Sequence, residues 1–223
     1  MSDLVQRANS AVSDSNPLAV LQRIRQQKAA PTVRPGERCD LCAEPVPDDH
    51  SHVVDVQARN LMCVCRGCYL LFTPGGAGGG HYRAIPDRYM RLASSGASRL
   101  PWDQFQIPVG VAFFFFNSSL GHVVAFYPGP AGATESELPL DKWIELEAAD
   151  PTLRSMEPDV EALMVRADSV PGRSVASEAY VVPIDACYEL VGELRRLWRG
   201  FDGGQEAHDA IDSFFSRLRE RAS

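Results

Sequence analysis

The chain has 223 residues, of which 45% are hydrophobic and 23% are charged, so it can bury a core without disulfide bonds. Its 29 acidic residues outnumber its 22 lysines and arginines, which gives a formal net charge of -7 at pH 7. This balance argues against nucleic acid or an anionic membrane as partner, because phosphate binding needs clustered basic side chains.

The sequence shows no export or membrane signal. Its first twenty residues are polar, unlike a signal peptide. The most apolar run, Val109–Phe116, is less than half as long as a membrane-spanning helix requires. We therefore expect a cytoplasmic protein without membrane insertion, in a compartment where thiols stay reduced and paired cysteines favour metal binding over disulfides.

Five of the six cysteines lie between residues 39 and 68, at the spacing of metal ligands. Thiolates two residues apart can close a tight turn on one ion, and Zn²⁺ takes four such ligands tetrahedrally. Cysteine can also pack as a small hydrophobic residue, but five thiols at these offsets favour a metal. We predict one zinc ion bound by Cys39, Cys42, Cys65 and Cys68.

The remaining ligand candidates leave alternatives open. In a strand, Cys63 points to the same side as Cys65, so it either packs under the site or replaces Cys65. His50 and His52 are within reach along the sequence and can also replace a thiolate.

Iron is the competing ion, because four thiolates in two pairs also suit a rubredoxin-type iron or an iron–sulfur cluster. Rubredoxin turns usually carry Pro and Gly beside the cysteines. Here Ala43 follows the first pair and Tyr69 the second, which favours zinc.

The N-terminal part of the chain predicts a loose tail and a small metal module. Residues 1–30 are expected to form a flexible tail and a short helix after Pro17. Residues 31–92 are expected to form a treble-clef-like zinc module. Its central hairpin would pair strands at 52–57 and 60–65, and a short helix would follow over 68–72.

Residues 97–223 predict an α+β domain, built from a small mixed sheet of about four strands with helices on one face. Its predicted elements are strands at Ile107–Phe116, Gly121–Tyr127, Ala162–Arg166 and Glu178–Val182, and a helix at Leu138–Ala149. Apolar residues at helical spacing on either side of Gly200–Gly204 predict a C-terminal helical hairpin, with Cys187 in its core.

A glycine-rich run at 75–80 is expected to be a flexible linker, and the residues after it form a candidate partner surface. His81, Tyr82 and Arg83 would lie beside the rigid module, where binding residues often occur. Tyr and Arg also carry interface energy most often. The sequence contains no recognisable catalytic constellation or cofactor-binding motif, so we expect a non-enzymatic protein.

A nuclease is a weaker alternative. Asp49-His50, Asn60 and the second cysteine pair superficially resemble a His-Asn-His nuclease, in which such residues bind a catalytic metal inside a treble clef. The match is incomplete, because Tyr69 stands where that family carries Asn or His. The acidic charge also disfavours a DNA substrate.

Most of the chain beyond residue 36 resembles an uncharacterised family, a domain of unknown function. The resemblance rests on Arg38–Cys42, Gly79–Arg83 with Pro86-Asp87, Ile107–Val109 with Ala112–Phe114, Ala125–Pro128, Glu157–Leu163 and Pro183–Tyr188. Its members resemble proteins encoded beside actinobacterial-type nickel–iron uptake hydrogenases. The resemblance therefore implies an accessory protein that contacts a nickel–iron hydrogenase or its maturation factors, and it supplies no catalytic residue.

Overall fold

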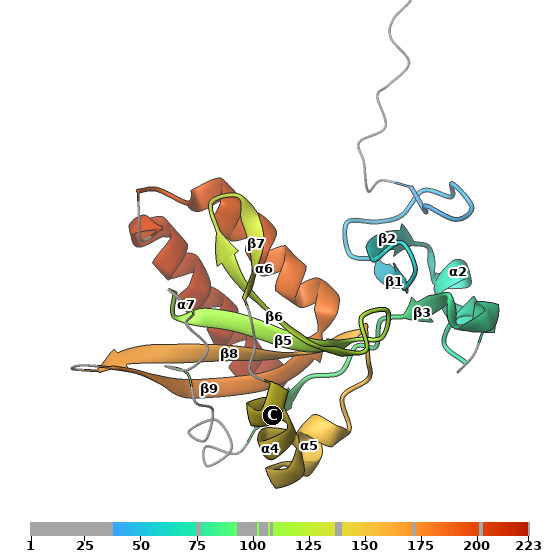
Figure 1. Ribbon diagram of the computed structural model, residues 1–223. Coiled ribbons are helices and arrows are strands. Elements are labelled where there is room, and N and C mark those ends of the chain that lie inside the picture. The colour runs from blue at the N-terminus through green and yellow to red at the C-terminus, as the bar shows by residue number, and fades with distance from the viewer. Residues whose placement is uncertain are drawn as a thin grey trace, which may run out of the picture. The chain divides into compact units, whose positions relative to one another are not determined.

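Two antiparallel sheets organise the described part of this computed structural model (Figure 1). The structure describes residues 38–74, 77–92, 102, 107, 109–136, 140–170, 173–200 and 203–222. The chain divides into two units, 1–35 and 36–223, and every described residue belongs to the second. The predicted tail and short helix over 1–30 lie outside the described residues.

The smaller sheet contains three strands in the order β2-β1-β3. The strands are β1 (Ser51–Asp55), β2 (Asn60–Val64) and β3 (Tyr82–Ala84), and they are accompanied by helix α2 (Arg66–Leu71) and the 3₁₀ turn η1 (Ala77–Gly80). The predicted hairpin and the helix after it are confirmed. Part of the predicted glycine linker forms the turn η1, and β3 was not predicted.

The larger sheet contains six strands in the order β4-β9-β8-β5-β6-β7, all antiparallel. Its strands are β4 (Met90–Arg91), β5 (Val111–Asn117), β6 (His122–Gly129), β7 (Gly132–Ser136), β8 (Glu161–Val170) and β9 (Arg173–Pro183). Its helices are α4 (Leu140–Ala149), α5 (Pro151–Arg154), α6 (Ile184–Leu197) and α7 (Gly204–Arg221). The α+β class is confirmed, but the sheet is larger than predicted and antiparallel rather than mixed.

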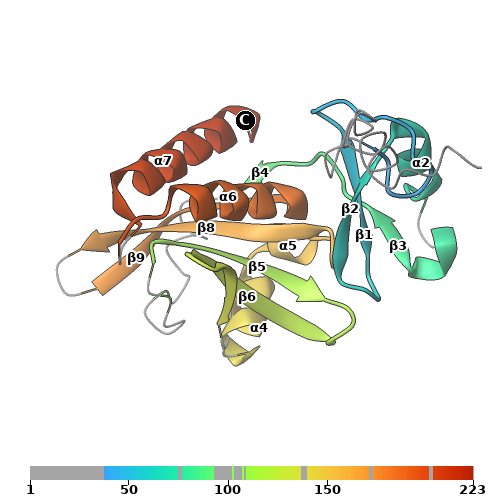
Figure 2. The ribbon, with the colours of Figure 1, turned by 90° about the horizontal axis from the view of Figure 1, so that it is seen from above.

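Helices cover both faces of the large sheet, so the expectation of helices on one face is wrong (Figure 2). Phe113 and Phe115 of β5 pack in the core that contains α6 and α7. Phe114 points to the other face and stacks on Trp143 of α4, with ring centroids 6.1 Å apart. The consecutive phenylalanines follow from this burial, because a strand covered on both faces has no polar side.

The predicted C-terminal helical hairpin is confirmed by α6 and α7. Gly203 precedes α7 with a φ of 94°, and a Cβ there would lie 3.2 Å from the Cβ of Ala207, so glycine suits this turn. Cys187 is fully buried in the core, as predicted. In the described part of the chain, no helix is long and apolar enough to cross a membrane.

The segment that connects the two sheets is fixed to the large sheet by a buried ion pair. The Arg88 guanidinium donates two hydrogen bonds to Glu161, one of them at 2.6 Å from Nε to Oε1, and Glu161 is fully buried. Beyond it, Met90 and Arg91 pair with β9. The chain thus joins the large sheet before residue 92, inside the range predicted for the metal module.

Replacing Arg88 by Met should lower the free energy of unfolding by about 3–5 kcal/mol at pH 7, because it leaves the Glu161 carboxylate buried without its cation. Urea denaturation followed by circular dichroism measures this change. The double variant Arg88→Met/Glu161→Met should recover much of the loss, since it removes both charges. Arg154→Met, at an exposed arginine of α5, is the matched control and should change little. Equal stability of the Arg88→Met variant and the control would contradict the prediction.

Candidate metal centre

Four cysteine sulfurs from two separate turns gather at one end of the small sheet. The sulfurs of Cys39, Cys42, Cys65 and Cys68 all lie within 4.8 Å of one another. Metal–sulfur bonds of about 2.3 Å in a tetrahedron place neighbouring sulfurs about 3.8 Å apart. The Cys42 and Cys65 sulfurs are 3.6 Å apart. The cluster predicted from the sequence is therefore assembled, and its donor set and spacing can hold a metal ion.

A tight turn supplies the first pair of sulfurs. The backbone N–H of Cys39 donates to the Glu44 carbonyl at 2.7 Å, and the N–H of Ala43 donates to the Cys39 carbonyl at 2.8 Å. Ala43 adopts a left-handed conformation with a φ of 63°, which closes the turn after Cys42. Cys39 is buried and Cys42 is exposed, so the cluster lies at the surface of the protein.

The start of helix α2 supplies the second pair. Cys65 precedes the helix in an extended conformation, and its carbonyl accepts the first helical hydrogen bond from the N–H of Tyr69 at 3.0 Å. Cys68 lies in the first turn of the helix. The end of β2 and the start of α2 thus place these two sulfurs close together, as a ligand pair separated by two residues requires.

The sulfurs interact strongly enough to change one another's protonation. Burial acts to raise the pKa of the Cys39 thiol, but hydrogen bonds from the backbone N–H groups of Cys65 and Cys42 lower it to about 6. Burial, together with hydrogen bonds to the Cys42 and Cys39 sulfurs, raises the pKa of the Cys68 thiol to about 12. Four adjacent thiolates are therefore unfavourable by themselves, and a bound cation would remove that repulsion.

Cys63 does not take part in this cluster. The expectation that it shares a side with Cys65 fails because β2 ends at Val64, so the two-residue alternation does not continue to Cys65. Cys63 instead lies with His50 and His52, and its sulfur and one ring nitrogen of each histidine lie within 4.8 Å of one another. The two histidines therefore do not replace a thiolate in the four-cysteine cluster.

The three residues of the predicted partner surface make contacts inside the chain. His81 Nε2 lies 2.8 Å from Oδ1 of Asp55, the last residue of β1. Tyr82 stacks on the His81 ring and packs against the small core of the module. Arg83 donates to the Pro158 carbonyl at 2.7 Å, which fixes the small sheet to the loop before β8. A structural role accounts for all three side chains.

The geometry does not support the nuclease arrangement. In the hairpin register, Ser51 pairs with Val64 and Asp55 pairs with Asn60. Asn60 therefore lies at the turn of the hairpin, whereas His50 precedes the opposite end of β1. Several residues of extended strand separate the two, so they cannot bind one metal ion together.

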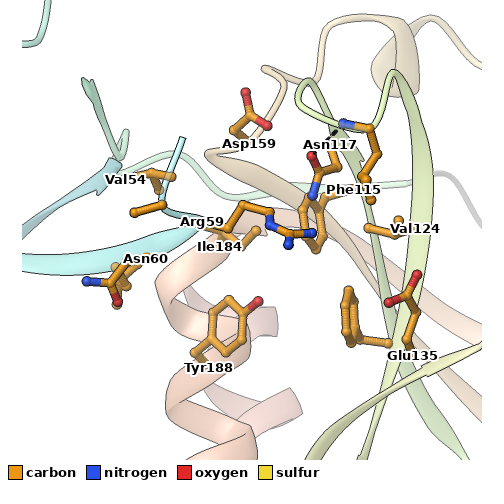
Figure 3. A pocket seen from close by; sticks show the side chains of 14 residues that line it. Val54, Arg59, Asn60, Phe115, Asn117, Val124, Glu135, Asp159, Ile184 and Tyr188 are labelled. Atoms are coloured by element: carbon orange, nitrogen blue, oxygen red, sulfur yellow. Dashed lines mark hydrogen bonds between the residues drawn. The ribbon is translucent and has the colours of Figure 1, made fainter. Parts of the chain in front are cut away.

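A pocket of about 380 Å³ lies between the hairpin turn, the β5–β6 face and α6 (Figure 3). Phe115, Phe126 and Tyr188 line it, Arg59 extends into it from the turn, and Glu135 lies on the opposite wall. The sequence places Arg59 in a turn, but nothing local in it shows that this turn meets the sheet and α6. The pocket was therefore not predicted.

A family model described as a family of unknown function, DUF5947, matches residues 38–222. The chain belongs to this family. No curated protein and no solved structure matches it. The resemblance to an uncharacterised domain is thus confirmed, and the link between this DUF5947 protein and a hydrogenase stays a prediction.

In this DUF5947 protein, Cys39→Ser and Cys68→Ser should each abolish stoichiometric metal binding, because each removes one of four ligands. Apparent binding energies of about 10–16 kcal/mol at such sites are largely folding energy, so residues 38–74 should also become protease-sensitive. Elemental analysis and limited proteolysis with mass spectrometry measure both effects, and α6 and α7 should stay protected. Cys187→Ala is the matched control and should keep the metal. Full metal content in both serine variants would show that these thiols are not ligands.

Proposed function

We propose that the four cysteines bind one structural zinc ion in a treble-clef-like module, and that the protein is a non-enzymatic accessory protein acting through protein contacts. The observation that carries this proposal is the closed set of four sulfurs. Four protein thiolates saturate a tetrahedral ion and leave no position for a substrate. The order of turn, hairpin and short helix supports the treble-clef assignment.

Zinc fits the needs of this module better than a redox ion does. Among the described residues, Cys39, Val53 and Val64 are the buried members of its separate core, so a cross-link between the two cysteine turns has a clear structural use. Zn²⁺ supplies that cross-link without redox chemistry. Iron would fit the same four sulfurs, and it would make the protein a rubredoxin-like electron carrier.

The pocket is the surface that we propose for the protein contact, in place of the region around His81. It combines aromatic walls from Phe115, Phe126 and Tyr188 with one basic side chain, Arg59, and two acidic ones, Glu135 and Asp159. Such a pocket suits an apolar side chain of a partner segment, with Arg59 and Glu135 to orient polar groups beside it.

The family resemblance supplies the partner in this proposal, namely a nickel–iron hydrogenase or its maturation factors. An acidic protein with a rigid module and an apolar pocket is suited to hold another protein in position during assembly. The role of the zinc is then indirect, because it fixes the hairpin that forms one wall of the pocket.

Protein expressed in its native host and purified under anaerobic conditions should contain zinc at the four-cysteine cluster and show no visible absorption from iron. Elemental analysis and the absorption spectrum decide this point. Stoichiometric iron with thiolate charge-transfer bands would overturn the zinc assignment and favour the electron carrier.

Tyr188→Ala and Arg59→Ala should each weaken the contact with the hydrogenase component about 30-fold or more, if these side chains are the energetic centre of the interface. Co-purification from the native host followed by titration of the purified components measures the change. Ile144→Ala is the matched control, because this exposed apolar residue lies on α4, on the other face of the sheet. Normal hydrogenase activity in a deletion strain, with no co-purifying component, would show the accessory role to be wrong.

A further inference from the structure

A second group of metal-ligating side chains lies apart from the four cysteines. His52 in β1 and Cys63 in β2 are directly opposite in the hairpin register, and such pairs point to the same face of the sheet. His50 lies two residues before His52, with the two ring centroids 4.8 Å apart. The strand geometry therefore brings two imidazoles and one thiol together, with one candidate ligand atom of each within 4.8 Å of the others.

The hydrogen bonds of the two histidines leave the same ring atom available on each. His50 Nδ1 lies 2.7 Å from the Pro47 carbonyl oxygen, and His52 Nδ1 lies 2.9 Å from Asp185 Oδ2. A carbonyl or carboxylate oxygen only accepts, so each Nδ1 carries the proton and donates it. In the neutral imidazole, Nε2 is then the unprotonated nitrogen, which is the form that binds a metal.

The free nitrogen of His50 has no partner to satisfy it. His50 Nε2 is shielded from solvent and forms no hydrogen bond with any residue that the structure describes. In the same described part of the chain, no hydrogen bond joins the Cys63 sulfur to either imidazole. A buried acceptor without a partner lowers stability by about 1–3 kcal/mol. A cation bound at His50 Nε2 would remove this cost.

We propose that His50, His52 and Cys63 bind a second divalent transition-metal ion and leave one coordination position open. Imidazole and thiolate ligands select Zn²⁺ and its neighbours over Mg²⁺ and Ca²⁺, which prefer oxygen. Three protein ligands with a free fourth position are typical of exchangeable or reactive zinc sites rather than of closed structural ones. A water molecule, or a donor atom of a partner protein, would complete the coordination.

The partners of the two histidines support this assignment. Histidine ligands commonly donate their second ring N–H to a carboxylate or a backbone carbonyl, which fixes the ring and raises its basicity. Asp185 takes that role for His52, and the Pro47 carbonyl takes it for His50. Asp185 lies in the first turn of α6, so the proposed ion would also tie the hairpin to the large sheet.

Cobalt titration of protein that holds one zinc equivalent tests the proposal. We expect a second equivalent to bind, with a visible spectrum of tetrahedral Co²⁺ and weak thiolate charge transfer from a single sulfur. Cys63→Ser and His52→Gln should each lose this second equivalent and keep the first zinc. His122→Gln, at a histidine whose Nδ1 bonds the Leu120 carbonyl, is the matched control and should bind both.

The variant Asp185→Asn tests whether the contact between Asp185 and His52 supports metal binding or only the fold. Loss of the hydrogen-bond acceptor behind a ligating histidine typically weakens metal binding about 10- to 100-fold. Co²⁺ should therefore bind to the second site more weakly by that factor, while the zinc at the four cysteines is unchanged. If the contact between His52 and Asp185 served the fold alone, Asp185→Asn would leave the Co²⁺ affinity of the second site unchanged.

A measurement on the unaltered protein covers the case in which a variant fails to fold. Excess Zn²⁺ should protect Cys63 from alkylation, as read by mass spectrometry of the digested protein. A wild-type protein that already holds one metal equivalent and takes up no further one, or a Cys63 thiol that reacts equally with and without added Zn²⁺, would overturn the proposal. Neither result depends on whether the four-cysteine cluster holds zinc or iron, so this test is independent of the proposed function.

Discussion

A cross-link between the two cysteine turns would stabilise the small sheet, because its separate core is small and some of its apolar residues, such as Val54 and Ile85, pack in the core of the large sheet instead. Its separate core contains three buried side chains, Cys39, Val53 and Val64. Full burial of one such aliphatic side chain contributes roughly 1.5–3 kcal/mol, and ordering a single residue costs about as much. By contrast, the large sheet buries apolar side chains on both of its faces. A four-thiolate ion would supply what the small sheet lacks.

The two sheets are joined by polar contacts at several points along the chain. Arg83 reaches the loop before β8, Arg88 pairs with the buried Glu161, and His52 meets Asp185 at the start of α6. Each contact links a residue of the first hundred to one at least 70 positions later. These contacts position the hairpin turn against β5, β6 and α6, and the pocket exists because of them. The pocket is therefore a property of both sheets together, whereas the four-cysteine cluster lies within the small-sheet module.

The sequence predicted local features well and long-range ones poorly. The spacing of Cys39, Cys42, Cys65 and Cys68 predicted a cluster, because two pairs of cysteines, each separated by two residues, are typical of four-thiolate metal sites. The hairpin and C-terminal helices followed from apolar periodicity. The second face of the large sheet was missed because a run of phenylalanines indicates burial but not what covers it. The group formed by His50, His52 and Cys63 required the register of β1 and β2 and the end of β2 at Val64, neither of which is encoded locally.

The short strand β4 determines how the chain can be divided. Met90 and Arg91 hydrogen-bond to the outer side of β9, and Leu92 donates to Ala179 just beyond them. A fragment that begins at residue 97 would remove this cover, exposing backbone N–H and C=O groups of an apolar strand to other molecules. It would also strip the cation from the Glu161 carboxylate. Such a fragment would lack one edge strand of the large sheet and would tend to associate edge to edge through β9.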